Sequence, residues 1–77
     1  MDKGQKVEEQ PTLGQTRVRI EFNPSGTDEV TSIKVRTAEL IDSCEYLKQH
    51  GKDGRLCALA QTAYEEAAMW AVKAATS

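Results

Sequence analysis

One stretch of the chain, residues 55–75, constrains the fold more than any other. It contains no Gly and no Pro, and eight of its residues are Ala, the residue with the highest helix propensity. Two apolar stripes follow the three- and four-residue spacing of an amphipathic helix. The first, which we expect to pack along another helix, consists of Leu56, Ala60, Ala63, Ala67, Trp70 and Ala74. The second runs beside it and consists of Cys57, Tyr64, Ala68, Ala71 and Ala75.

A second long helix is predicted from about Asp28 to Gln49. Its apolar stripe repeats at alternating spacings of three and four residues and includes one polar member. The stripe consists of Val30, Ile33, Thr37, Leu40, Cys44 and Leu47. Asp28 and Glu29 fall in the first turn, where carboxylates interact favourably with the positive end of the helix dipole.

The link between the two predicted helices spans residues 49–54. Gly51 suits the left-handed conformation that often follows a helix, and Asp53 can cap the helix that comes next. Because so short a link leaves no room for a crossover, we expect the helices to run antiparallel, as a hairpin. Trp70 is then expected to be buried between them.

The N-terminal part of the chain has a different character. Residues 1–15 are polar and lack periodicity, which predicts a flexible tail. From Thr16 to Phe22 apolar and charged residues alternate, which predicts a short strand or extended arm, followed by a turn at residues 23–26. A single strand needs a partner, so the arm either pairs with another copy or lies across the hairpin. The expected domains are therefore a tail, 1–15, and an arm plus hairpin, 16–77.

Size and charge narrow the functional classes. A chain of 77 residues forms one domain and buries only about 60% of its unfolded surface, so we expect a homo-oligomer. The net charge of −2 provides no sequence-wide field to attract DNA or RNA. The sequence shows no signal peptide and no apolar run of membrane-spanning length, which favours an intracellular location and no membrane partner.

No catalytic constellation is visible in the sequence. Cys44, Cys57 and His50 lack the spacing of metal ligands, and both cysteines are expected to act as small buried hydrophobes. The pair Glu65–Glu66 near Lys73 is typical of a solvated face. We therefore expect no enzymatic activity, no metal and no cofactor.

Three side chains remain as candidates for binding. Arg55 begins a helix whose free backbone N–H groups already favour anions, so it calls for an anionic ligand or for a salt bridge, with Asp53 as one partner. Phe22 is either a plug in the core or a platform for a flat ring. If oligomerisation brings Phe22, Lys34 and Arg55 together, they could hold a base and its phosphates.

These residues resemble a known family. The run FNPSGTDEVTSIKVRTAELID, followed by DGRLCALAQTAYEEAAMWAVKA, is similar to the phage sponge proteins that disarm bacterial cyclic-nucleotide immunity. The anti-CBASS and anti-Thoeris sponges share this helical-hairpin domain, and the resemblance covers about Phe22 to Ala75. Its most specific part is the second helix, with an Arg at its start, a Thr after Gln61, the run Met69-Trp70-Ala71 and Lys73.

The resemblance implies a function. Such proteins are not enzymes; they form homo-oligomers, typically hexamers, and sequester cyclic di- or trinucleotides in pockets between subunits in the host cell cytoplasm. The anti-Thoeris branch also binds cyclic ADP-ribose isomers. By resemblance, Phe22 stacks on a base, Lys34 meets a phosphate, and Arg55 and Thr62 contact the nucleotide. The aromatic residue here is Phe, without the Tyr hydroxyl, and the arm is too short for the β domain of the anti-Thoeris branch.

Taken together, the sequence predicts a mainly α protein: an antiparallel two-helix hairpin with a short N-terminal extended arm or strand, assembled as a homo-oligomer. Its expected function is to sequester cyclic oligonucleotide messengers without cleaving them, which would block CBASS-type signalling. The alternative is a non-catalytic helical assembly module that binds a protein partner. A small nucleic-acid-binding protein is a third possibility, against which the net charge argues.

Overall fold

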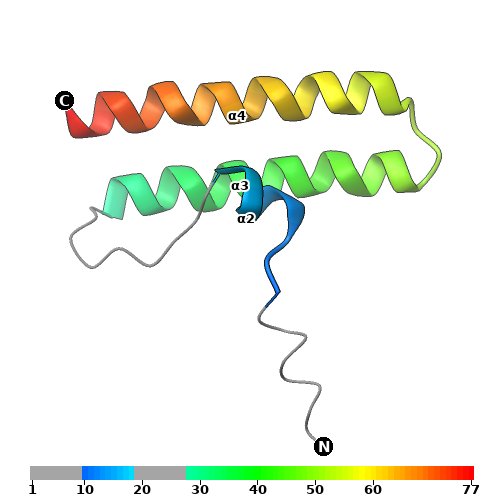
Figure 1. Ribbon diagram of the computed structural model, residues 1–77, viewed down its shortest axis with the longest axis horizontal. Coiled ribbons are helices and arrows are strands. Elements are labelled where there is room, and N and C mark those ends of the chain that lie inside the picture. Colours follow the sequence, from blue (N-terminus) through cyan, green and yellow to red (C-terminus); the bar gives the residue numbers. More distant parts are fainter. Residues whose placement is uncertain (1–9, 19–27) are drawn as a thin grey trace, which may run out of the picture.

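The computed structural model describes residues 10–18 and 28–77. These residues form three helices, α2 at Leu13–Val18, α3 at Asp28–Gln49 and α4 at Gly54–Thr76, and contain no strand. The helices α3 and α4 run antiparallel, and α2 lies across α3 near the middle of that helix (Figure 1). The predicted mainly helical hairpin is confirmed.

The turn between the long helices forms as its sequence predicts. The backbone N–H groups of His50 and Lys52 both donate to the carbonyl of Leu47, at 3.1 and 3.0 Å. Gly51 adopts a φ of +89°, a left-handed value that side chains disfavour, which explains the Gly at this position. Asp53 caps α4, because its side-chain Oδ1 accepts a hydrogen bond from the Leu56 backbone N–H at 3.0 Å.

The face that α4 turns toward α3 differs from the prediction. Leu56 and Trp70, members of the expected contact stripe, are 57% and 56% exposed. The second stripe faces α3 instead, with Cys57 and Ala68 buried and Tyr64 packed against the core. The expectation that Trp70 is buried in the hairpin is therefore wrong for the single chain.

The contact face of α3 is displaced in the same way. Leu40 and Leu47 of the expected stripe are 45% and 42% exposed, whereas Ala38 and Ile41 are buried. A buried polar group fits this choice of faces: Gln61 Nε2 donates to the carbonyl of Ile41 and to Glu45 Oε1, both at 3.1 Å. Rotating α4 so that Leu56 and Trp70 face α3 would take Gln61 out of the interface and break both hydrogen bonds.

The predicted strand at Thr16–Phe22 is wrong over Thr16–Val18, which are helical; the rest of that segment, with Phe22, lies outside the described residues. A reciprocal cap starts the helix, since Thr12 N–H donates to Gln15 Oε1 and Gln15 N–H donates to Thr12 Oγ1. The helix buries Val18 in a core cluster with Ala38, Ile41 and Ala68. Helical geometry thus lets α2 join the core without the partner strand that an arm would need.

Close backbone contact holds α2 against α3. A Cβ atom on Gly14 would collide with the carbonyl oxygen of Ala38 and lie 2.7 Å from its carbonyl carbon. The Gly14 backbone N–H donates to Asp42 Oδ1 at 2.6 Å.

The boundary at residue 15 that we expected between tail and domain falls inside this docked helix. The described helices include none that is long and apolar enough to cross a membrane.

Candidate functional site

A groove with a volume of about 610 Å³ lies where the three helices meet. Its apolar lining comes from Val18 of α2 and from Ala68, Met69 and Val72 of α4. Its polar lining consists of Arg17, Lys34, Thr62, Glu65, Glu66 and Lys73. The groove therefore combines an apolar surface with charged side chains, as sites for amphipathic small molecules commonly do.

Cations from all three helices line this groove. Arg17 comes from α2, Lys34 from α3 and Lys73 from α4, and they face two carboxylates, Glu65 and Glu66. Among the described residues, three cations thus line one groove, although the whole chain carries a net charge of −2. Lys and Arg side chains are the groups that bind phosphate through charge-assisted hydrogen bonds.

An ion pair joins α2 to α4 at the groove. Arg17 Nη2 and Nε both donate to Glu65 Oε1, at 2.8 and 3.1 Å. The Arg17 side chain is 27% exposed and that of Glu65 is 45% exposed, so the pair lies at a partly open surface. Partial exposure keeps its contribution to stability small but leaves the guanidinium accessible to a ligand.

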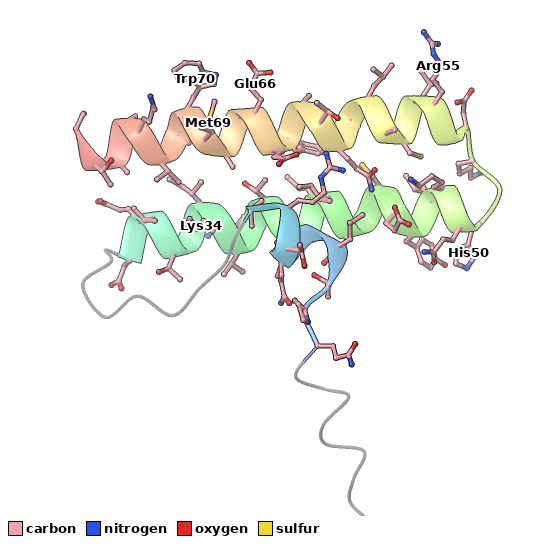
Figure 2. All side chains as sticks on the ribbon, viewed as in Figure 1. Lys34, His50, Arg55, Glu66, Met69 and Trp70 are labelled. Carbon is pink, nitrogen blue, oxygen red and sulfur yellow. The ribbon has the colours of Figure 1, made fainter. Side chains whose placement is uncertain are left out.

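An exposed aromatic side chain of α4, Trp70, contacts two residues that line the groove, Glu66 and Lys73. Trp70 Nε1 donates to Glu66 Oε2 at 3.4 Å, and Lys73 Nζ lies 5.4 Å from the centroid of the Trp70 ring. Trp70 and Glu66 point away from α3 (Figure 2). Contacts with Trp70 thus help to place two charged groups of the groove, Glu66 and Lys73.

The family described as "Acb2/Tad1, hairpin domain" matches residues 14–76, which is most of the chain. The chain belongs to this family. It is the family of the anti-CBASS and anti-Thoeris sponges, so the resemblance inferred from the sequence is confirmed. No curated protein and no solved structure matches the chain.

The region matched to the Acb2/Tad1 hairpin domain begins at Gly14, inside α2, and includes all of α3. It therefore contains all the described residues that line the groove, as well as the docking contact of α2 with α3. The short helix α2 belongs to the matched domain together with the hairpin.

The four predicted site residues of this hairpin domain do not all lie together. Lys34 and Thr62 both line the groove. Arg55 is exposed, lies in the first turn of α4 and points away from α3 (Figure 2). Phe22 lies outside the described residues. The ligand contacts of all four stay predictions.

Sequence reasoning missed two of the three cations of the groove. Arg17 was assigned to an alternating strand, and Lys73 was interpreted as part of a solvated face. The signal for Arg17 was present, because the pattern Thr-x-x-Gln at residues 12–15 is a capping box that predicts a helix start. Lys73 belongs to the pattern by which the second helix resembles the sponge family, but its place in the groove depends on how α4 is rotated against α3.

A second surface feature lies at the turn end of α3. The rings of Tyr46 and His50 stack with centroids 3.9 Å apart, and His50 Nδ1 lies 2.8 Å from the Tyr46 carbonyl.

Within residues 10–18 and 28–77, no group of three or more His, Cys, Asp and Glu side chains is arranged to hold a metal ion.

Proposed function

We propose that this protein is a cyclic-nucleotide sponge. It binds cyclic di- or trinucleotide messengers without cleaving them, in the cytoplasm of the host cell, and thereby blocks CBASS-type antiviral signalling. The observation that carries the proposal is the convergence of Arg17, Lys34 and Lys73 from three helices on one groove. Membership of the Acb2/Tad1 hairpin family supports it.

The groove has the chemistry that such a ligand requires. A cyclic dinucleotide carries about two negative charges at neutral pH, which Lys and Arg side chains can bind through charge-assisted hydrogen bonds. Its bases are flat and partly apolar, and Ala68, Met69 and Val72 offer an apolar surface for them. In this proposal Lys34 binds a phosphate and the Thr62 hydroxyl hydrogen-bonds the nucleotide.

Arg55 and Phe22 complete the proposed set of ligand contacts. Arg55 is separated from Thr62 by two turns of α4, or about 10 Å along the helix axis. In this proposal Arg55 therefore binds nucleotide at a second site, which lies between subunits of the oligomer. Phe22 stacks on a base.

The proposed assembly is a homo-oligomer, with a hexamer as the expected form. Large apolar side chains exposed on α4 support it, namely Leu56, Leu59, Met69 and Trp70. Covering these side chains with another subunit removes apolar surface from water, which lowers the free energy of the assembly. Because α4 also lines the groove, the same assembly would place binding sites near subunit boundaries.

Calorimetry against a panel of cyclic di- and trinucleotides tests the proposal, with linear dinucleotides as controls. We expect the parent protein to bind at least one cyclic compound more tightly than its linear counterpart and to return it intact on denaturation. Lys34→Ala should weaken this binding, whereas Lys52→Ala, at an exposed position in the turn, should not. Cleaved nucleotide, or no binding across the panel, would contradict the proposal.

A second function remains a candidate because of the exposed apolar side chains of α4. Leu56, Leu59 and Trp70 would equally suit a helical assembly module that binds a different protein. The same calorimetry separates the two functions, because an assembly module has no reason to prefer cyclic over linear nucleotides.

A further inference from the structure

The helix α2 contributes one charged side chain, Arg17, to the groove. Arg17 lies outside the two long helices of the hairpin. Arg17 lies on the last turn of α2 and lines the groove with Lys34 and Lys73. Its place is fixed by the rigid docking of α2, in which Gly14 contacts the Ala38 backbone and donates to Asp42. Arg17 is therefore held at the groove wall by the fold.

The ion pair with Glu65 orients the guanidinium without using all of its donors. An Arg side chain carries five N–H donors in a planar fork. Two of them, one on Nε and one on Nη2, are directed at a single oxygen, Glu65 Oε1. The guanidinium thus lines the groove with donor capacity beyond the contact with Glu65, and planar guanidinium groups match phosphate oxygens well.

We propose that Arg17 is a further phosphate-binding residue of this groove and that Glu65 is its positioning residue. The proposal rests on the sponge function proposed above, and it assigns the phosphodiester of a cyclic nucleotide as the group that Arg17 binds. Glu65 has two opposing effects: it holds the guanidinium in place, and its negative charge repels the ligand.

The two roles make opposite predictions for two variants that break the same ion pair. Arg17→Gln removes the phosphate contact, so affinity should fall by about tenfold or more, in the range of a lost charged hydrogen bond. Glu65→Gln removes the repelling charge and keeps an amide oxygen for Arg17, so affinity should stay the same or rise. If Arg17 served only to dock α2, Arg17→Gln would leave the dependence of affinity on salt unchanged, because no charge contact with the ligand would be lost.

The experiment is calorimetry on the full chain with cyclic di-AMP, cyclic di-GMP and cyclic AMP–GMP as probes, at two salt concentrations. Arg36→Gln is the matched control, because Arg36 is an exposed Arg of α3 that donates to Ser32 outside the groove. Arg17→Gln should also reduce the dependence of affinity on salt, since one charge contact is lost. Circular dichroism and sedimentation check that each variant keeps the fold and assembly of the parent.

The outcomes distinguish this inference from the proposed function. Weaker and less salt-dependent binding by Arg17→Gln, with Glu65→Gln and Arg36→Gln at or above the parent affinity, supports it. A parent that binds while Arg17→Gln binds equally well, or binds more weakly with the salt dependence of the parent, overturns the role of Arg17 and leaves the sponge function standing. A folded parent that binds none of these probes overturns the inference, and one that also binds no cyclic trinucleotide overturns the sponge function.

Discussion

Gln61 is only 1% exposed and places a polar amide inside the interface between the two long helices. Its Nε2 group is satisfied by the Ile41 carbonyl and by Glu45 Oε1. Among the described residues, no buried side-chain nitrogen or oxygen lacks a hydrogen-bond partner. Because an unsatisfied buried amide costs about 1–3 kcal/mol, this pairing favours one rotation and one register of the hairpin over its alternatives.

The same network makes stability depend on pH through Glu45. The hydrogen bond from Gln61, then contacts with Lys48 and Gln49, lower the pKa of the Glu45 carboxyl below its ordinary value. Its contribution to the free energy of unfolding is therefore complete above the unfolded pKa of about 4.3 and is lost as the pH falls through the lower folded value.

We predict that Glu45→Gln loses less stability than the parent between about pH 5 and pH 3, because the ionised carboxylate no longer takes part. Denaturant unfolding at a series of pH values measures this difference. Glu39→Gln, which changes an exposed glutamate of the same helix, is the control and should retain the steep loss of the parent. Equal slopes for the parent and Glu45→Gln would show that the network contributes nothing measurable.

At the scale of elements, the six residues of α2 are stabilised by docking more than by their own helicity. So short a helix is marginal in water, because nucleation is costly and few backbone hydrogen bonds follow. Three contacts compensate: the burial of Val18, the ion pair of Arg17 with Glu65, and the close approach of Gly14 to Ala38. Of these, the last depends on the absence of a side chain at residue 14.

We predict that Gly14→Ala displaces α2 from α3 and destabilises the domain by about 1–3 kcal/mol, the usual cost of overpacking. Hydrogen exchange should show faster exchange in residues 13–18, and thermal unfolding should report the loss of stability. Gly54→Ala is a matched control, since its Cβ would meet the Lys48 side chain at an ordinary 3.5 Å. Slow exchange of α2 in Gly14→Ala would mean that the contact yields at little cost.

At the scale of the whole molecule, the single chain leaves much of α4 uncovered. Leu56, Leu59, Met69 and Trp70 are each about half exposed or more, and Trp70 points away from α3 (Figure 2). A small domain that exposes this much apolar surface gains stability when a second copy covers it. The outer face of α4 is therefore the surface on which we expect subunits to meet.

We predict that Trp70→Ala weakens self-association while the hairpin keeps its helical content. Large aromatic side chains dominate interface energies, and Trp70 lies outside the core cluster that the described residues form. Sedimentation at micromolar concentration should show smaller species, and circular dichroism should remain helical. Tyr46→Ala, at an exposed aromatic position on α3, serves as the control and should associate like the parent. Loss of helicity in Trp70→Ala at all concentrations would instead return this residue to the folding core.

Much of the fold was predictable from local sequence. The bounds of α3, the cap at Asp53 and the left-handed Gly51 depend on interactions within a few residues, which sequence patterns report directly. The start of α2 was also encoded, in the capping pair Thr12 and Gln15, but the alternation of apolar residues that follows it suggested a strand.

What local patterns could not decide was which face of each helix turns inward. Two apolar stripes on α4 were available, and the more hydrophobic one, with Leu56 and Trp70, stays outside. With the other face inward, Gln61 finds hydrogen-bond partners on α3, and Ala68 and Ala38 are small enough for the helices and α2 to pack closely. That choice of face also set the groove, since Arg17, Lys34 and Lys73 come together through packing and share no sequence motif. The sequence by itself thus determined the elements and their connection, and packing between the elements decided the site.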